Sequence, residues 1–462
     1  MYELDLNKPV KVFFCGIGGI SMSGLAEILL SKRFKVAGSD IRDSELTERL
    51  EKLGAEIHIG QEASNVSDDT DLFVYTAAIS PDNPEFSKAV EKNIPMLTRA
   101  ELLGEIMHGY GTAVCVSGTH GKTTTTSMVT EIFIKAGMDP TVTVGGMLKD
   151  IGGNLRIGSS GNFIAEACEY TNSFHSFFPT IALILNIEED HMDFFKDIND
   201  IRASFKKFAS LLPADGTLVI NSGIEAYTEL TEALECHVVT FGTDEGADYR
   251  ATDISFDDRG LCSYTLHRKT PGGEETEKIK LSVPGEHNVY NSLAAIAAAD
   301  AAGADKSAIV PGLESFKGAG RRFEYKGEIG GVTVIDDYAH HPSEIKATLL
   351  AAERYPHKRL WVVFQPHTYT RTKAFLDDFA KALSMADEVV LLDIYAAREK
   401  NTVGISSADL KDKLDKKGRK AVYFKYFDDA EAYLLQHCTA GDLVLTVGAG
   451  DVYRIGEHLL GK

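Results

Sequence analysis

Residues 114–124 read VCVSGTHGKTT, a short apolar run followed by a glycine-rich turn and the start of a helical pattern, and this stretch decides the fold. Backbone N–H groups of such a turn form a concave anion site, and the helix dipole adds partial positive charge. The Lys122 ammonium would reach the outer phosphates of a nucleotide, and the Thr123 hydroxyl can ligate Mg²⁺. Val116 stands where the usual motif has its first glycine, and a turn that only caps a helix is the structural alternative. We predict a phosphate loop.

Two polar clusters follow the next apolar runs along the chain. Glu166 and Glu169 follow the run at 163–166, and the sequence NIEEDHMD at 186–193 follows the run at 181–185. Residues just past the carboxyl ends of parallel strands line the ligand crevice of an open α/β sheet, so both clusters should converge on the phosphate loop. One Glu, one hydroxyl and one His would suffice for Mg²⁺, which keeps water and phosphate oxygens as its other ligands. Read alone, each cluster is typical of a solvated loop or a helix N-cap.

A second glycine turn lies near the N-terminus. Residues 13–24 read FFCGIGGISMSG, and the next predicted strand ends in Gly38, Ser39 and Asp40. A strand, a glycine turn, a helix and then an acid about 20 residues on resemble the dinucleotide fingerprint. Ser21 replaces the third glycine, which disfavours NAD itself. We expect some nucleotide diphosphate at this helix N-terminus, and tight packing of strand on helix is the alternative.

The remaining polar motifs lie toward the C-terminus. Asn288 and Asn291 lie one helical turn apart, where two amides can hydrogen-bond a base or an acyl group, and helix capping would explain only one of them. Polar stretches at 336–342 and 365–372 each follow a predicted strand, so they should face a common crevice. The paired histidines of the first stretch have no third ligand at suitable spacing, so we do not predict a zinc site there.

The chain has 462 residues, which predicts about three domains. Apolar runs alternate with helical patterns, as in α/β units with parallel sheets, whereas residues 249–283 have the turn signals of antiparallel hairpins. Glycine-containing segments at 109–111 and 318–320 are the best boundaries. We predict an α/β fold of three domains: a Rossmann-like N-terminal domain, a central P-loop ATPase-type domain with a mixed sheet, and a Rossmann-like C-terminal domain. Their predicted bounds are 1–109, 110–319 and 320–462.

Composition and charge disfavour several classes of partner and of protein. Apolar residues make up 44% and charged residues 25% of the chain, as in ordinary globular proteins. The formal net charge of −20 disfavours nucleic acid and anionic membranes as partners. Six widely spaced cysteines do not form a disulfide scaffold, and we find no signal peptide and no apolar run long enough to span a membrane. We expect a reduced, cytoplasmic protein that is a monomer or a weak homodimer.

Taken in order, these motifs resemble those of the Mur ligase family, the ATP-dependent amide-forming enzymes of peptidoglycan synthesis. The resemblance covers essentially the whole chain. Within the family, the segments at 16–24, 336–342 and 365–372 are similar to those of the member that adds the first amino acid. The resemblance implies ATP and Mg²⁺ as cofactors and UDP-N-acetylmuramate and L-alanine as substrates, joined through an acyl phosphate. It also implies a role in cell wall biogenesis, and so in cell shape, the cell cycle and cell division.

The resemblance implies specific roles for residues of this chain. The catalytic residues it implies are Lys122, Glu166 and His191, and the metal ligands are Thr123, Glu166 and His191. The ATP-binding residues are Gly118, Thr119, His120, Gly121, Lys122, Thr123, Thr124, His287, Asn288, Asn291, Arg322 and Asp337. The UDP-sugar-binding residues are Gly16, Gly18, Gly19, Ser23, Ser39 and Asp40. The amino-acid-binding residues are Tyr338, His367 and Arg371.

Several alternatives stay open. The acidic stretch departs from the common family pattern after Glu166, so Glu169 is a second candidate for the metal-facing acid. Several related ligases use a carbamylated lysine at a position that matches Phe205, so we do not transfer that feature. The competing functions are a nicotinamide-dependent oxidoreductase, a P-loop ATPase acting as a switch or transport module, and a family member that adds another amino acid or a recycled tripeptide.

Overall fold

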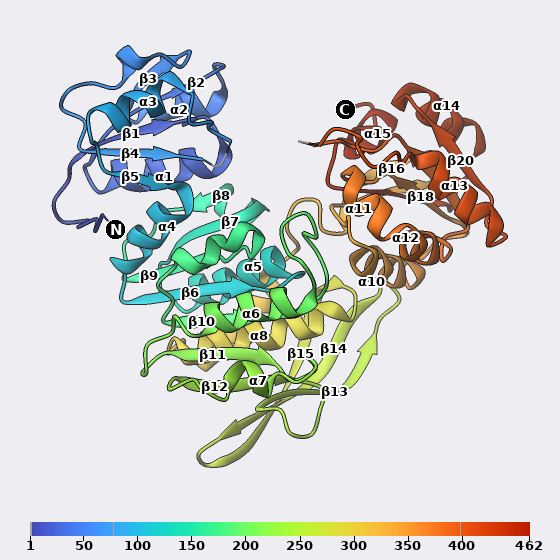
Figure 1. Cartoon of the computed structure of the whole chain (residues 1–462). Helices are drawn as coiled ribbons and strands as arrows, with labels where there is room; N and C mark the ends of the chain where they lie inside the picture. Colours follow the sequence, from blue (N-terminus) through green and yellow to red (C-terminus); the bar gives the residue numbers. More distant parts are fainter. Residues whose placement is uncertain (1, 77, 398) are drawn as a thin grey trace.

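The computed structural model describes residues 2–76, 78–397 and 399–462 and has three α/β domains. The N-terminal domain (blue in Figure 1) is built on a parallel five-stranded sheet of order β3-β2-β1-β4-β5. Its elements are β1 (Lys11–Cys15), α1 (Ile20–Ser31), β2 (Lys35–Asp40), α2 (Glu45–Lys52), β3 (Glu56–Ile59), β4 (Leu72–Tyr75), α3 (Pro84–Glu91), β5 (Met96–Thr98) and α4 (Arg99–His108). Local capping starts three of these helices, at Ser44, Asn83 and Thr98.

The central domain holds a mixed ten-stranded sheet of order β15-β14-β13-β12-β11-β10-β6-β9-β7-β8. Its strands are β6 (Thr112–Ser117), β7 (Thr141–Leu148), β8 (Gly153–Arg156), β9 (Asn162–Glu166), β10 (Ile181–Ile184), β11 (Thr217–Asn221), β12 (His237–Gly242), β13 (Tyr249–Phe256), β14 (Leu261–Thr270) and β15 (Gly273–Pro284). Its helices are α5 (Lys122–Lys135), η3 (Tyr170–Ser176), α6 (Ile198–Ala209), α7 (Thr228–Thr231), α8 (His287–Ala301) and α9 (Ile309–Ser315). The strands β13, β14 and β15 pair antiparallel, which confirms the hairpins predicted for 249–283.

The C-terminal domain has a six-stranded sheet of order β16-β17-β21-β18-β19-β20, in which only the edge strand β16 is antiparallel among the described residues. Its strands are β16 (Glu324–Ile329), β17 (Val332–Asp337), β18 (Leu360–Phe364), β19 (Glu388–Leu392), β20 (Ala421–Phe424) and β21 (Leu443–Val447). Its helices are α10 (Pro342–Glu353), α11 (Tyr369–Ala374), α12 (Leu376–Leu383), α13 (Ser407–Lys416), α14 (Phe427–His437) and α15 (Tyr453–Leu459). The predicted three-domain α/β architecture is confirmed.

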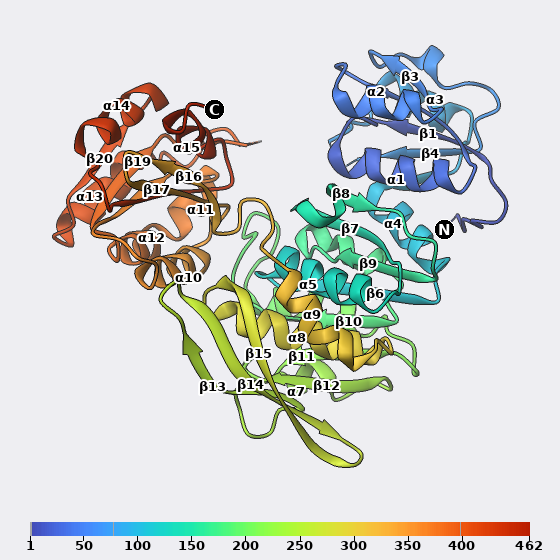
Figure 2. The same cartoon turned by 180° about the vertical axis from the view of Figure 1, so that it is seen from behind.

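Two different contacts hold the outer domains to the central one. Figures 1 and 2 show the N-terminal and C-terminal domains on the two sides of the central domain. On the N-terminal side, Leu102 and Ile106 of α4 share one apolar core with Phe174 and Phe205 of the central domain. On the C-terminal side the contacts are polar side chains and loops, described below. An apolar joint that excludes water resists opening more strongly than a polar one, so the C-terminal domain is the one expected to move.

The parallel strands in the middle of each sheet are covered on both faces and are nearly continuous apolar runs, whereas β13, β14 and β15 alternate between buried and more exposed residues. In the C-terminal domain, Val362 and Leu445 face one core and Val363 and Val444 face the other. All six cysteines are free thiols. Among the described residues, no helix combines the length and the apolar character needed to cross a membrane.

Candidate active site

The phosphate loop joins β6 to α5, as the sequence predicts for a nucleotide site. Gly121 has a φ of 84° and forms the N-cap of α5, and a Cβ there would lie 2.5 Å from Asn291 Oδ1. Only glycine fits such a position. Asn186, at the end of the neighbouring strand, accepts a hydrogen bond from the His120 N–H at 2.8 Å and donates one to the His120 carbonyl at 3.1 Å. The loop is therefore clamped to the end of β10.

Lys122 lies at the start of α5 and is held by oxygen atoms. Its Nζ donates to the carbonyls of Gly118 and Thr119 and lies 2.9 Å from Glu169 Oε2. Burial disfavours the charged amine and is the largest single influence, but the neighbouring groups, Glu169 foremost, together outweigh it and raise the pKa of Lys122. The lysine is therefore a fixed positive charge at the phosphate loop, where its predicted role needs one.

The candidate metal ligands surround the same helix end. Glu166 Oε1 accepts a hydrogen bond of 2.6 Å from the Gly145 N–H, and a Cβ on the adjacent Gly146 would lie 3.0 Å from the Thr123 methyl group. Two successive glycines of β7 thus line the approach to the carboxylate and the hydroxyl. On the other side, His191 Nε2 lies 3.8 Å from Glu169 Oε1. Carboxylates and a hydroxyl are donors that Mg²⁺ prefers, so this set fits the ion, and both Glu166 and Glu169 lie close enough to Lys122 to raise its pKa.

A cavity of about 310 Å³ opens beside the loop, between the central and C-terminal domains. Polar groups from four separate sequence motifs line this cavity at the domain junction. The predicted ATP-binding residues that line the cavity are His120, Gly121, Thr123, Thr124, His287, Asn288, Asn291, Arg322 and Asp337. The lining does not include Gly118, Thr119 and Lys122, which lie on the loop itself. The apolar side chains Leu185, Phe241 and Phe316 complete a wall suited to a flat base.

Among the predicted ATP-binding residues that line the cavity, two amides and one carboxyl are held by hydrogen bonds within the protein. Asn288 donates to the Pro284 carbonyl at 2.7 Å, and Asn291 donates to Asn288 Oδ1 at 2.9 Å. Asp337 accepts hydrogen bonds from the backbone N–H groups of Phe323 and Ala339. Burial raises the pKa of Asp337 to about 6, against the opposing influence of Arg322. Asn288 is thus tied to the end of β15, Asn291 is fixed in turn by Asn288, and helix capping explains neither residue, because α8 has no side-chain N-cap.

The predicted amino-acid-binding residues lie at the edge of the C-terminal domain nearest to His191. Arg371 donates to Asp190 Oδ1 from Nη2 at 2.8 Å and from Nε at 3.1 Å. Its Nη1 lies 3.2 Å from His367 Nδ1. Tyr338 lies farther along and receives the guanidinium groups of Arg321 and Arg322 on its ring. Arg371 and His367 are therefore adjacent to the candidate metal site, whereas Tyr338 lies beside Arg321 and Arg322.

The N-terminal glycine turn has the predicted strand–turn–helix geometry. The Gly18 N–H donates to Asp40 Oδ2 at 2.9 Å, which ties the turn to the end of β2. The Ser39 hydroxyl is fully buried and donates to Glu85, and the buried Ser23 hydroxyl donates to the Ile20 carbonyl. These two serines contact protein groups beneath the turn, whereas Gly19 at the helix start is exposed.

For several polar residues at the domain junction, the sequence predicts no role. Asp190 and Glu188 belong to the polar cluster at 186–193, whose sequence predicts no specific role for either. Ser343 and Glu344 at the start of α10 contact His120 from the other domain. A capping box explains Glu344 locally, because its carboxylate accepts from the backbone N–H of His341. The contact across domains has no signal in the local sequence.

Comparison with known proteins gives matches over the whole chain. Residues 11–110 match the family described as "Mur ligase family, catalytic domain", residues 116–299 match "Mur ligase middle domain", and residues 321–450 match "Mur ligase, glutamate ligase domain". The UDP-N-acetylmuramate–L-alanine ligase of Lachnospira eligens is 58% identical over 461 residues, covering 100% of both chains. The enzyme of the same name from Agathobacter rectalis is 55% identical, again over 100% of both chains.

Solved structures agree with these matches. The UDP-N-acetylmuramate-alanine ligase of Thermotoga maritima is 30% identical, with a TM-score of 0.79 and 98% of each chain covered. A murein peptide ligase from Psychrobacter arcticus shares the fold at 24% identity, with a TM-score of 0.70 and 98% of each chain covered.

Proposed function

Because the chain belongs to the Mur ligase family, we propose that it joins L-alanine to the lactyl carboxylate of UDP-N-acetylmuramate in peptidoglycan synthesis, at the expense of ATP. The observation that carries this proposal is the 58% identity, over the full length of both chains, to a UDP-N-acetylmuramate–L-alanine ligase. The products are ADP, phosphate and UDP-N-acetylmuramoyl-L-alanine. The three domains, which we assign to residues 1–109, 110–319 and 320–462, bind the UDP-sugar, ATP and the amino acid respectively.

The reaction needs activation of a carboxylate. An ionised carboxylate repels an amine and has oxide as a very poor leaving group. Transfer of the γ-phosphoryl group of ATP to the carboxylate oxygen gives an acyl phosphate, and the neutral amine of alanine then displaces phosphate through a tetrahedral intermediate. Phosphoryl transfer depends mainly on positioning and charge neutralisation, and bound Mg²⁺ supplies part of that neutralisation.

The residues around the phosphate loop have the charges that this chemistry needs. Lys122 would bind the β- and γ-phosphates, since its ammonium is fixed beside the loop carbonyls. Thr123 and Glu166 would hold one Mg²⁺, and His191 would hold a second one near the acyl oxygen. Glu169 neighbours both Lys122 and His191 and is the alternative carboxylate ligand.

Helix α8 of the central domain and the two outer domains would supply the remaining contacts. His287, Asn288 and Asn291 would hold the base side of ATP, with Arg322 and Asp337 reaching it from the C-terminal domain. Tyr338, His367 and Arg371 would position L-alanine, with the Arg371 guanidinium on its carboxylate. The N-terminal turn would bind the UDP-sugar with the residues Gly16, Gly18, Gly19, Ser23, Ser39 and Asp40. Closing of the domains would exclude water and protect the acyl phosphate from hydrolysis.

Positive potential at these sites is local, despite the net charge of −20. Helix N-termini, Lys122, Arg322 and Arg371 supply it where phosphates and carboxylates would bind. We propose that the protein acts in the cytoplasm and is a monomer or a weak homodimer. Nucleic acid and membranes are not among the partners that we propose.

A coupled assay of ADP release tests the proposed function. UDP-N-acetylmuramate with L-alanine should support turnover, whereas other amino acids or a recycled tripeptide should not. Phosphate release without any acceptor would instead indicate an ATPase switch. Stabilisation of the protein by NAD in a thermal-shift assay would favour an oxidoreductase, and we expect none.

A further inference from the structure

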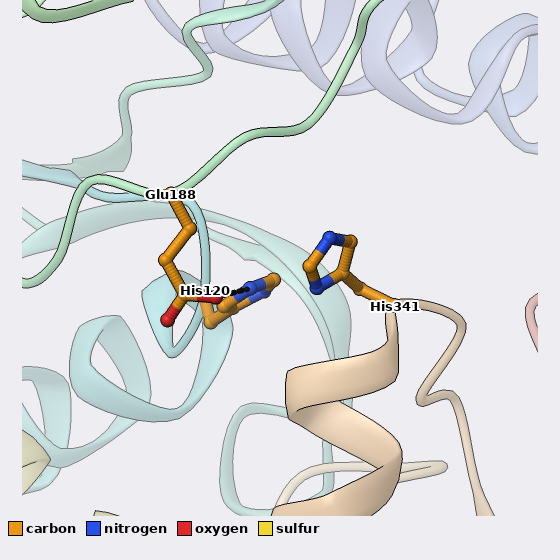
Figure 3. A group of neighbouring side chains, drawn as sticks. All are labelled: His120, Glu188 and His341. Atoms are coloured by element: carbon orange, nitrogen blue, oxygen red, sulfur yellow. Dashed lines mark ion pairs between the residues drawn. The ribbon is translucent and has the colours of Figure 1, made fainter. Parts of the chain in front are cut away.

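Three side chains from three loops meet where α10 of the C-terminal domain touches the phosphate loop. His120 belongs to the phosphate loop, Glu188 to the segment after β10, and His341 to the N-cap of α10. Their potential ligand atoms all lie within 4.8 Å of one another. Figure 3 shows the Glu188 carboxylate beside the His120 ring, with the His341 ring approaching from the other domain. The ring centroids of His120 and His341 are 4.9 Å apart.

The Ser343 hydroxyl lies at the centre of this group. It donates to Glu188 Oε2 at 2.6 Å and lies 2.7 Å from His341 Nδ1 and 3.0 Å from His120 Nε2. Glu188 Oε2 also lies 3.4 Å from His120 Nε2, and the Ser343 backbone N–H donates to His341 Nδ1 at 3.4 Å. Two ring nitrogens and one carboxylate oxygen therefore converge on the point occupied by this oxygen, which is the arrangement that a bound cation needs.

Outer contacts already orient both imidazoles for ligation. Glu344 Oε1 lies 3.2 Å from His120 Nδ1, which directs Nε2 toward the centre. His341 Nε2 lies 3.0 Å from the Glu189 carbonyl, so this nitrogen donates its proton there and leaves the Nδ1 lone pair facing Ser343. A carboxylate or carbonyl that accepts from the far ring nitrogen is the usual outer shell of a metal-bound histidine.

The chemical types of the three ligand side chains indicate which class of ion would bind. Two imidazoles and one carboxylate, at the edge of the cavity that His120 and Glu188 line, match zinc-class ions, whereas Mg²⁺ prefers sets in which most ligands are oxygens. The distances to the Ser343 oxygen are within about 1 Å of the 2.0–2.2 Å typical of zinc ligands. Rotation of Ser343 and a small contraction would therefore complete the site.

We propose that His120, Glu188 and His341 bind a zinc-class divalent ion at the position of the Ser343 hydroxyl, and that the ion fastens the C-terminal domain to the phosphate loop. This site is separate from the oxygen-rich set that fits Mg²⁺. The proposal goes beyond the ligase reaction, because it concerns an ion that links two domains through the start of α10. Its test measures binding directly, so failure of the ligase assignment would leave the result unaffected.

The test is a titration of untagged, full-length protein with Co²⁺, followed by its visible absorption, and then competition with Zn²⁺. We expect one tetrahedral Co²⁺ per chain with nitrogen and oxygen ligands, unaffected by excess Mg²⁺ and displaced by Zn²⁺. His341→Asn keeps a good N-cap for α10 but lacks the imidazole, and it should weaken binding by roughly tenfold or more. Ser343→Ala removes the competing hydroxyl and should strengthen binding.

His437→Ala, at an exposed position at the end of α14, is the matched control and should bind Co²⁺ like the parent. Far-ultraviolet circular dichroism verifies that each variant is folded, and Ser343→Ala gives an independent result if His341→Asn is not. A thiolate charge-transfer band, displacement of Co²⁺ by Mg²⁺, or unchanged affinity in both the His341→Asn and Ser343→Ala variants would overturn the proposal.

Discussion

Lys122 and Glu169 form a buried ion pair at the phosphate loop, in which the lysine Nζ lies 2.9 Å from Oε2 and 3.2 Å from Oε1. The Glu169 side chain is only 3% exposed, so it has little water to stabilise its charge. Breaking such a pair from one side costs about 3–5 kcal/mol, because it leaves an uncompensated buried charge. The two residues are therefore coupled in stability as well as in the proposed chemistry.

Stability and catalysis can be separated at this pair. Lys122→Ala should lower kcat by about 10²–10³-fold or more, because it removes a positive charge from the transferring phosphoryl group, and should also lower the thermal midpoint. Adding Glu169→Gln should recover the midpoint but not kcat. Lys135→Ala, at the exposed end of the same helix, is the control for both measurements. Near-normal turnover of Lys122→Ala would contradict the phosphate-loop assignment.

Glu166 and Glu169 can be distinguished by their effect on the Mg²⁺ requirement. Glu166 shares the glycine-lined approach with Thr123, so Glu166→Gln should raise the Mg²⁺ concentration for half-maximal activity by roughly tenfold or more, because an anionic ligand is lost. Initial rates across a Mg²⁺ series measure this, with the exposed Glu225→Gln as the control. If only Glu169→Gln shifts the Mg²⁺ dependence, the metal ligand is Glu169.

The joint between the N-terminal and central domains depends on a close backbone approach. A Cβ at Gly104 of α4 would lie 1.9 Å from the Ser176 carbonyl oxygen, which no side-chain rotation relieves. Gly104→Ala should therefore destabilise the protein by about 1–3 kcal/mol or more through displacement of α4. Gly111→Ala is the control, because its Cβ would meet only an ordinary contact at 3.9 Å. Equal thermal midpoints for the two variants would show that the joint tolerates the added methyl.

The fold was predictable from the sequence because most strands are buried on both faces. The apolar runs at 163–166 and 181–185 became β9 and β10, whose observed bounds are Asn162–Glu166 and Ile181–Ile184. The strands β3 (EIHI) and β8 (GNLR) carry polar residues and were not predicted, since they are exposed or half-buried at sheet edges. A local apolar pattern indicates a strand that is buried. Edge strands are less buried, so their sequences lack that pattern.

The sequence predicts the part of the candidate site that lies within one domain, but not the contacts between domains. Strand ends in one sheet converge by topology, which brings Glu169 and His191 to the phosphate loop. The contact of Arg371 with Asp190 spans 181 residues and two domains. It depends on how the chain near 318–320 orients one sheet against another, and no local propensity encodes that orientation. The same reason explains why sequence spacing predicts no third ligand beside His341.

The Asp337 carboxyl gives the fold a specific pH dependence. Burial raises its folded pKa to about 6, above the value near 3.9 expected when unfolded. The folded chain therefore holds this proton more tightly, so the stabilisation is complete below about pH 4 and is lost as pH rises through about 6. Relative to Asp337→Asn, the parent should lose up to about 3 kcal/mol across that window.

Thermal midpoints of the parent and Asp337→Asn at about pH 4 and about pH 7 measure this difference, since groups common to both proteins cancel. The exposed Asp378→Asn serves as the control. A difference between parent and Asp337→Asn that is constant with pH would show that Asp337 ionises at the same pH in both states.

Arg371 is proposed to bind the alanine carboxylate, yet it also joins two domains through Asp190. Arg371→Ala should raise the KM for L-alanine by about 10- to 100-fold, the cost of a lost hydrogen bond to a charged group, with a much smaller effect on the KM for ATP. Arg371→Lys should not restore binding, because an ammonium lacks the planar fork. Lys373→Ala, exposed on the same helix, should leave both KM values unchanged.

Asp190→Asn separates the two roles of Arg371. This variant weakens the domain contact but keeps the guanidinium, so its KM for L-alanine should rise much less than that of Arg371→Ala. Steady-state rates at saturating ATP and UDP-N-acetylmuramate give the comparison. If Asp190→Asn and Arg371→Ala raise the KM for L-alanine equally, or if Arg371→Ala affects ATP and L-alanine alike, the arginine acts by holding the domains together, because a residue that only positions a domain cannot distinguish between the substrates bound there.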